Sequence, residues 1–170
     1  MSRKHSNISI FVPHIGCPNK CSFCNQRYIT GVCKGPGADD VGAAAAAAKS
    51  SKGYDPATTE IAFFGGSFTA INRNYMTDLL EAAAVFVREG SVRGIRISTR
   101  PDAIDEEICR ILKEYGVNAV ELGAQSMDDE VLLLNKRGHT AEDVRKATAL
   151  LKQYGFETGL QMMTGLYGSD

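Results

Sequence analysis

The chain has 170 residues, of which 44% are apolar and 23% charged, and its formal net charge is -1 at pH 7. This balance is typical of a soluble, folded domain, and it gives no general attraction to nucleic acid or membrane. No stretch approaches the roughly 18 apolar residues of a membrane span, and the N-terminus lacks a signal peptide's apolar core, so we expect a cytoplasmic protein without membrane contact. The oligomeric state cannot be read from these features.

Five short apolar segments are predicted to be β-strands. They alternate with longer amphipathic segments, which is the pattern of βαβ units and favours a parallel sheet. The predicted strands comprise residues 8–12, 60–66, 94–99, 118–123 and 157–163.

Three segments between these strands are predicted to be helices: 73–90, 105–116 and 140–155. Each ends in a glycine directly before a strand, as helices commonly do. In the first helix the expected apolar stripe is Tyr75, Leu79, Ala82 and Phe86. The alanine-rich segment 39–52 is either a thinly packed helix or a flexible low-complexity stretch, and propensity favours the helix. The preceding residues 33–40 contain Pro and two Gly and are predicted to be a loop.

The repeat of about 30 residues predicts a partial (β/α) TIM-like barrel that stops after about five strands. Since a fifth strand is followed by no helix, we expect residues 1–170 to form one core domain, an N-terminal fragment of a longer chain. Function is then expected in the loops at the carboxyl ends of the strands.

Polar and apolar residues alternate along two of the predicted strands. In 94–100, Arg96, Ser98 and Arg100 share one face, opposite two isoleucines. In 118–125, Glu121 and Gln125 similarly share a face. Helices packed on the apolar face would turn these polar residues toward the barrel interior. Arg96 and Glu121 could then form a structural ion pair inside the barrel. Such a pair is compatible with a substrate cavity nearby.

Three of the five cysteines lie close together: Cys17, Cys21 and Cys24 have the spacing C-x3-C-x2-C, directly after the first predicted strand. In a reducing compartment such a cluster favours metal binding over disulfides. A structural zinc site normally has four ligands, whereas a cubane iron-sulfur cluster held by three thiolates leaves one iron open. Cys33 or His14 would supply the fourth ligand of a zinc site, and that alternative stays open. Cys33 is otherwise expected to be a free thiol, and Cys109 a core residue.

The motif GCPNKCSFC, with Phe23 before its last cysteine, resembles the cluster-binding motif of the radical S-adenosylmethionine (radical SAM) enzymes. The segments FFGGSF, STRPD, ELGAQS and LNKRGHT narrow the resemblance to the radical SAM domain of the Elongator catalytic subunit and its bacterial relatives. The resemblance implies that Cys17, Cys21 and Cys24 bind a 4Fe-4S cluster whose open iron is chelated by S-adenosylmethionine (SAM).

The resemblance also implies residues for binding SAM. Gly65 and Gly66 would bring backbone close to its amino group, with Ser67 where many members have Glu. Ser98 and Gln125 would lie near the ribose, and Arg137 near the carboxylate. The full expected cofactor-binding set is Phe23, Gly65, Gly66, Ser67, Ser98, Arg100, Gln125 and Arg137.

Several of these residues have simpler interpretations. The glycine pair is also compatible with a tight turn, and Arg100 either serves an anion or belongs to a segment that caps the next helix through Asp102. His139 is expected to be a hydrogen-bonded structural residue, and Met162 and Met163 core residues. No catalytic residue can be named from the sequence.

The activity implied by the resemblance is reductive cleavage of SAM to a 5′-deoxyadenosyl radical that abstracts hydrogen from a substrate. A one-electron reductant such as flavodoxin or ferredoxin would be a partner. Elongator relatives modify the wobble uridine of tRNA, so tRNA is a candidate substrate, although no acetyltransferase segment lies within these residues. The alternatives are an oxygen-independent coproporphyrinogen oxidase-like enzyme and, from another class, a non-catalytic zinc-binding module.

Overall fold

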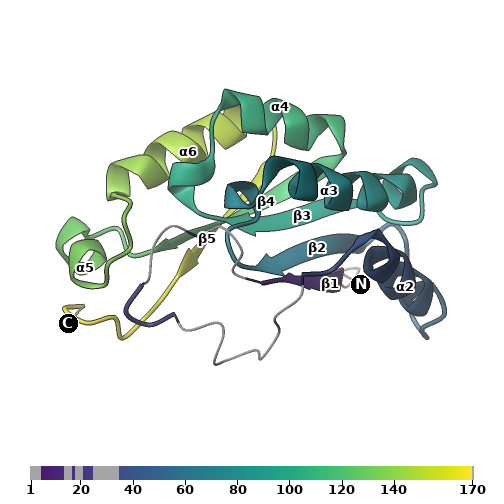
Figure 1. The fold of residues 1–170 in the computed structure, drawn as a ribbon, viewed down its shortest axis with the longest axis horizontal. Coiled ribbons are helices and arrows are strands. Elements are labelled where there is room, and N and C mark those ends of the chain that lie inside the picture. The colour runs from purple at the N-terminus through teal and green to yellow at the C-terminus, as the bar shows by residue number, and fades with distance from the viewer. Residues whose placement is uncertain (1–4, 14–16, 18–20, 25–34, 170) are drawn as a thin grey trace.

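Five parallel strands form a single sheet in this computed structural model, which describes residues 5–13, 17, 21–24 and 35–169. The strands are β1 (Ser6–Val12), β2 (Thr59–Gly65), β3 (Gly94–Thr99), β4 (Val117–Gln125) and β5 (Glu157–Met162). They neighbour one another in chain order, β1-β2-β3-β4-β5 (Figure 1). The predicted α/β fold with the strand order of a partial (β/α) barrel is therefore confirmed.

The helices α2 (Ala38–Lys49), α3 (Arg73–Arg88), α4 (Glu106–Glu114) and α6 (Ala141–Gln153) cover one face of the sheet (Figure 1). The predicted helix-ending glycines are confirmed: Gly90, Gly116 and Gly155 all have positive φ, between 70° and 82°. Three short elements in the strand-to-helix connections were not predicted, namely α5 (Asp129–Leu134), η1 (Phe68–Ala70) and η2 (Pro101–Ala103). They are too short to show an apolar period in the sequence.

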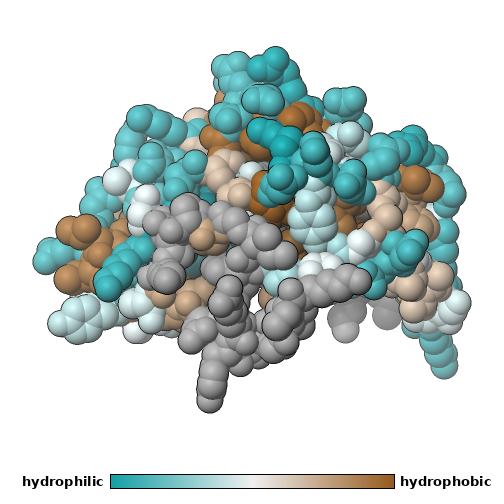
Figure 2. All heavy atoms as spheres, in the orientation of Figure 1, coloured by the Kyte–Doolittle hydropathy of each residue, from teal (hydrophilic) through white to brown (hydrophobic). Residues whose placement is uncertain are grey.

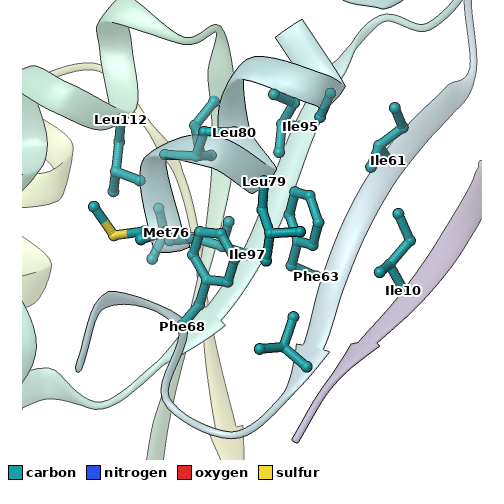
Figure 3. Close-up of a cluster of buried hydrophobic side chains, with 14 of the residues drawn as sticks. Ile10, Ile61, Phe63, Phe68, Met76, Leu79, Leu80, Ile95, Ile97 and Leu112 are labelled. Atoms are coloured by element: carbon teal, nitrogen blue, oxygen red, sulfur yellow. The ribbon is translucent and has the colours of Figure 1, made fainter. Parts of the chain in front are cut away.

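The main hydrophobic core lies between the sheet and these helices. Ile61, Phe63, Ile95 and Ile97 point from the strands toward α3, and the rings of Phe63 and Phe68 stack with centroids 4.8 Å apart (Figure 3). The buried stripe of α3 consists of Met76, Leu79, Leu80, Ala83 and Ala84. The predicted stripe also packs against the core: Leu79 is buried, and its other members, Tyr75, Ala82 and Phe86, are partly buried beside the main buried face.

The alanine-rich segment is a helix, as propensity favoured. Only Val41 and Ala45 of α2 are buried, because a run of methyl groups offers little apolar surface for docking. Tyr75 of α3 donates from its hydroxyl group to the carbonyl oxygen of Pro36 at 2.8 Å, which fixes the entry to α2.

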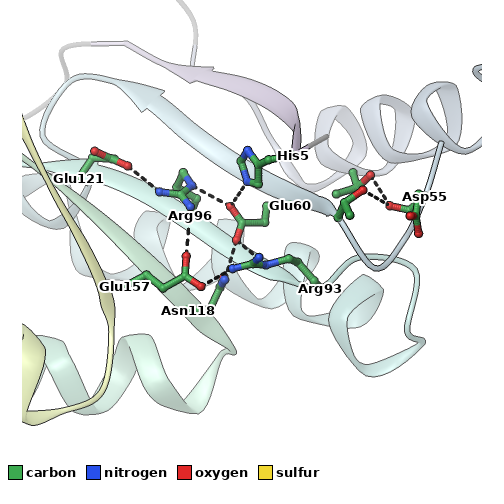
Figure 4. Close-up of polar contacts among 10 residues, drawn as sticks. His5, Asp55, Glu60, Arg93, Arg96, Asn118, Glu121 and Glu157 are labelled. Carbon is green, nitrogen blue, oxygen red and sulfur yellow. Dashed lines mark hydrogen bonds and ion pairs between the residues drawn. The ribbon is translucent and has the colours of Figure 1, made fainter. Parts of the chain in front are cut away.

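The other face of the sheet carries a network of charged side chains near the amino ends of the strands (Figure 4). Glu60, whose side chain is fully buried, accepts hydrogen bonds from Arg96 at 2.7 Å and from Asn118 at 2.6 Å. Arg96 also binds Glu121 at 2.5 Å, which confirms the predicted structural pair. Because Arg96 and Glu121 face away from the helices, the predicted alternation along β3 and β4 is confirmed as well.

β5 is an edge strand, and several apolar residues near it are exposed. Met162 is 55% and Met163 40% exposed, so their prediction as core residues was wrong. The sequence signal failed because, in the described part of the chain, β5 pairs with β4 alone, and Met163 lies just after the end of the strand. Hydrophobic surface also gathers over α5, where Leu133 is 78% exposed, whereas the surface over α4 and α6 is largely hydrophilic (Figures 1 and 2). No helix among the described residues is long and apolar enough to cross a membrane.

Candidate functional site

A cavity of about 320 Å³ lies where the strands end, bordered by residues that follow β1, β2, β3, β4 and β5. All of the predicted cofactor-binding residues line it, together with Cys17 and Cys24. Residues that are far apart in the sequence, such as Cys17 and Met163, therefore line the same cavity. Parallel strands create this convergence, because their carboxyl ends share one edge of the sheet.

The three cysteines lie in residues 17–24, which we call the cysteine segment. The described residues 21–24 anchor it. Cys21 is buried, and its carbonyl oxygen accepts a hydrogen bond from the backbone N–H of Cys24 at 3.1 Å. The exposed Ser22 donates from its backbone N–H to the carbonyl oxygen of Asn135 at 3.2 Å, and from its hydroxyl group to Asn135 Oδ1 at 3.0 Å. Asn135 is only 2% exposed, so these hydrogen bonds anchor the cysteine segment to a buried residue.

Asn135 was missed at the sequence level, although it belongs to the LNKRGHT segment. Its side-chain nitrogen donates to the carbonyl oxygens of Val131 at 2.8 Å and Tyr167 at 2.9 Å. One buried amide thus joins α5, the C-terminal segment and the cysteine segment. A lone Asn after an apolar run gives no sequence signal for such a role, since Asn is also common in turns.

Arg137 lies directly beside the cysteine segment. Its Nη1 donates to Cys21 Sγ at 3.3 Å, its Nη2 donates to the carbonyl oxygen of Gly123 at 2.5 Å, and its guanidinium carbon lies 5.8 Å from the centre of the Phe23 ring. Arg137 is 7% exposed. A Cβ atom at position 123 would lie 3.1 Å from Gln125 Nε2 and 3.4 Å from Arg137 Nη2, so a side chain there would crowd Gln125 and only touch the guanidinium.

The FFGGSF segment joins the ends of β1, β2 and β3. The backbone N–H of Gly66 donates to the carbonyl oxygen of Val12 at 2.9 Å. Gly65 has φ of 119°, and a Cβ atom there would collide with the carbonyl oxygen of Val12 and with the ring of Phe11. Glycine is therefore required at position 65 by backbone conformation and by space, which gives the pair a tight-turn role besides its place in the cavity wall.

Ser67 belongs to a buried cluster of hydroxyl groups. Its Oγ lies 2.9 Å from Thr99 Oγ1, which is also 2.6 Å from Thr69 Oγ1. Ser67 Oγ further accepts the backbone N–H of Arg100 at 3.2 Å. Ser67 thus ties the end of β2 to the end of β3.

Arg100 is almost fully buried at the cavity wall. Its Nε and Nη2 atoms donate to the two carboxylate oxygens of Asp102 at 2.9 and 2.8 Å, and Nη2 also donates to the carbonyl oxygen of Arg137 at 2.8 Å. Nη1 has no hydrogen-bond partner among the described residues, which leaves one buried donor for an anion. The alternative that Asp102 caps the next helix is wrong, because Asp105 accepts the backbone N–H of Ile108 at the start of α4.

His139 is buried behind the cavity and bonds to the backbone, as predicted for a structural histidine. Its Nε2 lies 3.1 Å from the carbonyl oxygen of Ala124, so this nitrogen carries the hydrogen. Burial and the nearby positive charge of Arg137 lower the pKa of His139, which keeps the imidazole neutral at pH 7.

The last strand and the residue after it contribute two lining residues that sequence reasoning missed, Gln161 in β5 and Met163 just beyond it. Gln161 Nε2 donates to Ser98 Oγ at 3.5 Å, and the backbone N–H of Met163 donates to the carbonyl oxygen of Gln125 at 2.9 Å. Gln125 has φ of 65°, a conformation that ends β4 and turns the chain along the cavity.

Three cysteine thiols are the ligand set of a cubane iron-sulfur cluster that leaves one iron open, whereas a structural zinc site normally has four ligands. Among the described residues, no group of three or more His, Cys, Asp or Glu side chains lies close enough together to hold a single metal ion. Thiolates of a cubane cluster each bind a different iron and need not converge on one point. His14 and Cys33, the other candidate zinc ligands, lie outside the described residues.

The family model described as the radical SAM superfamily matches residues 11–170. The chain belongs to the radical SAM superfamily. The match covers the cysteine motif and every segment that borders the cavity, so the resemblance indicated by the motifs is confirmed.

Two curated proteins illustrate what this radical SAM chain is similar to. It is 33% identical over 114 residues to the tRNA uridine(34) acetyltransferase of Dehalococcoides mccartyi, which covers 66% of this chain and 25% of that protein. It is 30% identical over 175 residues to the oxygen-independent coproporphyrinogen-III oxidase-like protein HemZ of Bacillus subtilis, which covers 98% of this chain and 35% of that protein. The chain therefore spans between a quarter and about a third of the length of these relatives.

Solved structures agree with the fold. The archaeal Methanocaldococcus infernus Elp3 superposes with a TM-score of 0.68 at 26% identity, covering 98% of this chain and 40% of that one. Coproporphyrinogen III oxidase (HemN) from Escherichia coli, a radical SAM enzyme, superposes with a TM-score of 0.61 at 21% identity, covering 97% and 39% of the two chains. The second likeness supports the fold alone.

Proposed function

We propose that Cys17, Cys21 and Cys24 bind a 4Fe-4S cluster and that the cavity at the strand ends binds S-adenosylmethionine. The observation that carries this proposal is the convergence of the predicted binding residues on one cavity, lined also by Cys17 and Cys24, in a chain of the radical SAM superfamily. When bound, these groups supply reductive cleavage of SAM to a 5′-deoxyadenosyl radical that abstracts hydrogen from a substrate.

The cavity walls offer a binding group for each part of SAM. Carbonyl oxygens at Gly65 and Gly66 would accept from the amino group, since a protonated amino group has hydrogens to donate and no lone pair to accept with. Ser98 and Gln125 would bind the ribose hydroxyls. The unpartnered Nη1 of Arg100, together with Arg137, would bind the carboxylate through charge-assisted hydrogen bonds.

Phe11, Phe23 and Met163 give the cavity an apolar border. These side chains would exclude water from the reacting centre, which protects a radical from side reactions. Phe23 is also held in place by the guanidinium of Arg137. The protein's contribution is thus to place and enclose the reactants.

For the substrate, we propose tRNA and modification of its wobble uridine. Relatives named tRNA uridine(34) acetyltransferase and the Elp3 structure support this choice. Coproporphyrinogen oxidase-like activity is the second candidate, supported by the HemZ similarity over 98% of this chain. A one-electron carrier such as flavodoxin or ferredoxin would supply the electron, and a cytoplasmic location fits a site built on three reduced thiols.

The first experiment tests the cofactors. The protein is reconstituted anaerobically with iron and sulfide, and 5′-deoxyadenosine is measured after addition of SAM and dithionite. Cys21→Ala should lose iron and product formation. Cys109→Ala is the matched control, because Cys109 is fully buried in the core between α4 and the sheet and should keep both. Stoichiometric zinc without SAM cleavage would overturn the proposal.

The second experiment tests the substrate. The yield of 5′-deoxyadenosine is measured in the presence of tRNA with uridine at the wobble position, together with acetyl-CoA, and separately with coproporphyrinogen III. Stimulation by the wobble-uridine tRNA, and not by the same tRNA with cytidine at that position, would support the first candidate. Stimulation by the porphyrinogen alone would replace it with the second.

A further inference from the structure

The contact between Arg137 and Cys21 is a feature that SAM binding alone does not explain. Arg137 Nη1 donates to Cys21 Sγ at 3.3 Å, and both residues are at least nine-tenths buried. A guanidinium that served only a carboxylate in the open cavity would not need a hydrogen bond to a thiol sulfur. Cys21 is also the only one of the three cysteines that does not line the cavity.

Several contacts hold the guanidinium in this position. Nη2 is fixed by the carbonyl oxygen of Gly123, and the planar group lies over the ring of Phe23. The backbone of Arg137 is fixed as well. Its N–H donates to the carbonyl oxygen of Leu132 at 3.0 Å, and its own carbonyl oxygen accepts from Arg100 Nη2. Contacts within the chain therefore direct this donor at Cys21, and its small exposure keeps the charge poorly screened by water.

We propose that Arg137 sets the reduction potential of the cluster held by Cys21, through its N–H···S hydrogen bond and its positive charge. This inference rests on the proposed function. Reduction transfers one electron from an external reductant to the cluster, with no bond formed or broken. The reduced cluster carries one more negative charge, so a buried cation and donor at a ligand sulfur stabilise it more than the oxidised cluster. Arg137 thus makes the cluster easier to reduce.

The test is an anaerobic redox titration with dithionite, followed by electron paramagnetic resonance, on reconstituted wild type and variants. Arg137→Gln should lower the ratio of reduced to oxidised cluster about tenfold at a fixed solution potential, a midpoint about 59 mV more negative for one electron. Arg110→Gln removes the same charge from an exposed site on α4 and should leave the midpoint unchanged. Iron content and circular dichroism establish that each variant holds its cluster and its fold.

Arg137→Lys provides a second measurement if the glutamine variant does not fold. Lysine keeps the charge but lacks the planar pair of nitrogens that donates to Gly123 and Cys21, so the midpoint should shift in the same direction by a smaller amount. A fully loaded Arg137 variant with the wild-type midpoint would overturn the role of Arg137 and leave the proposed function intact. A wild-type protein that binds no cluster would overturn both.

Discussion

Glu60 tests whether the charged network stabilises the face of the sheet that lies away from the helices. Its side chain is fully buried on the face away from the helices, yet it carries a carboxylate (Figure 4). Four side chains approach it: Asn118 at 2.6 Å, Arg96 at 2.7 Å, His5 at 2.8 Å and Arg93 at 2.9 Å. The perturbation is Glu60→Gln, which keeps the shape and removes the charge.

The expected cost follows from the partners that remain. Removing one member of a buried ion pair costs about 3–5 kcal/mol, because the other charge stays buried without compensation. Arg96 keeps Glu121 and Glu157 as partners, and Arg93 keeps Glu157. We therefore expect the lower end, a loss of about 3 kcal/mol in the free energy of unfolding.

The assay is urea unfolding followed by circular dichroism at pH 7. Glu142→Gln is the matched control, because its ion pair with Arg145 is exposed and should contribute no more than about 1 kcal/mol. A loss below about 1 kcal/mol for Glu60→Gln as well would refute the reasoning, since the network would then behave like a surface pair.

The same network predicts a pH dependence. Burial alone would raise the pKa of Glu60, but hydrogen bonds from Asn118, His5 and Arg96 outweigh it, and the pKa is lowered from its ordinary value of 4.5. A carboxyl group with a lowered pKa stabilises the fold above its ordinary pKa, and this stabilisation is lost as the pH falls through the lowered value. The stability difference between wild type and Glu60→Gln should therefore shrink below pH 4.5. A difference that stays constant from pH 7 down through acid unfolding would contradict the assignment.

Three further predictions concern Gly42, Gly65 and His139. Gly42→Ala should stabilise the protein by about 0.5–1 kcal/mol in thermal unfolding, because position 42 lies inside α2 and a Cβ atom there meets nothing within 4 Å. Gly65→Ala should destabilise it and reduce iron loading, since φ of 119° and the Val12 carbonyl oxygen leave no room for a side chain; equal stability of the two variants would contradict this. His139 should titrate below its ordinary pKa of 6.5 in an NMR pH series, and a midpoint above 6.5 would contradict the buried, neutral imidazole.

The cysteine spacing and the residues of the later loops were sufficient to predict where the cavity lies. Those residues follow strands, and the ends of parallel strands always meet at one edge. The connections within the site could not be predicted. Ser67 and Thr99 are 32 positions apart and Ser22 and Asn135 are 113 apart, so nothing local in the sequence pairs them.

Two features of the fold account for the differences between the predicted and the observed burial: the edge of the sheet and the orientation of a helix on it. The apolar pattern of Met162 and Met163 resembles a buried strand, but burial also requires neighbours, and among the described residues β5 pairs with β4 alone. The stripe of α3 was shifted because its orientation is set by the sheet against which it packs. A sequence period identifies an amphipathic helix more reliably than the exact face that becomes buried.

The sequence by itself determined the alternation of strands and helices, the glycines that end the helices, and the residue types that can bind a cluster and SAM. These are local properties of backbone conformation, periodicity and side-chain chemistry. Only the tertiary structure decided that Arg137 meets Cys21, that Asn135 holds the cysteine segment, and that Glu60 is a buried charge with four partners. Those outcomes depend on which side chains the folded sheet brings within hydrogen-bond distance, a property of three-dimensional packing that no single segment contains.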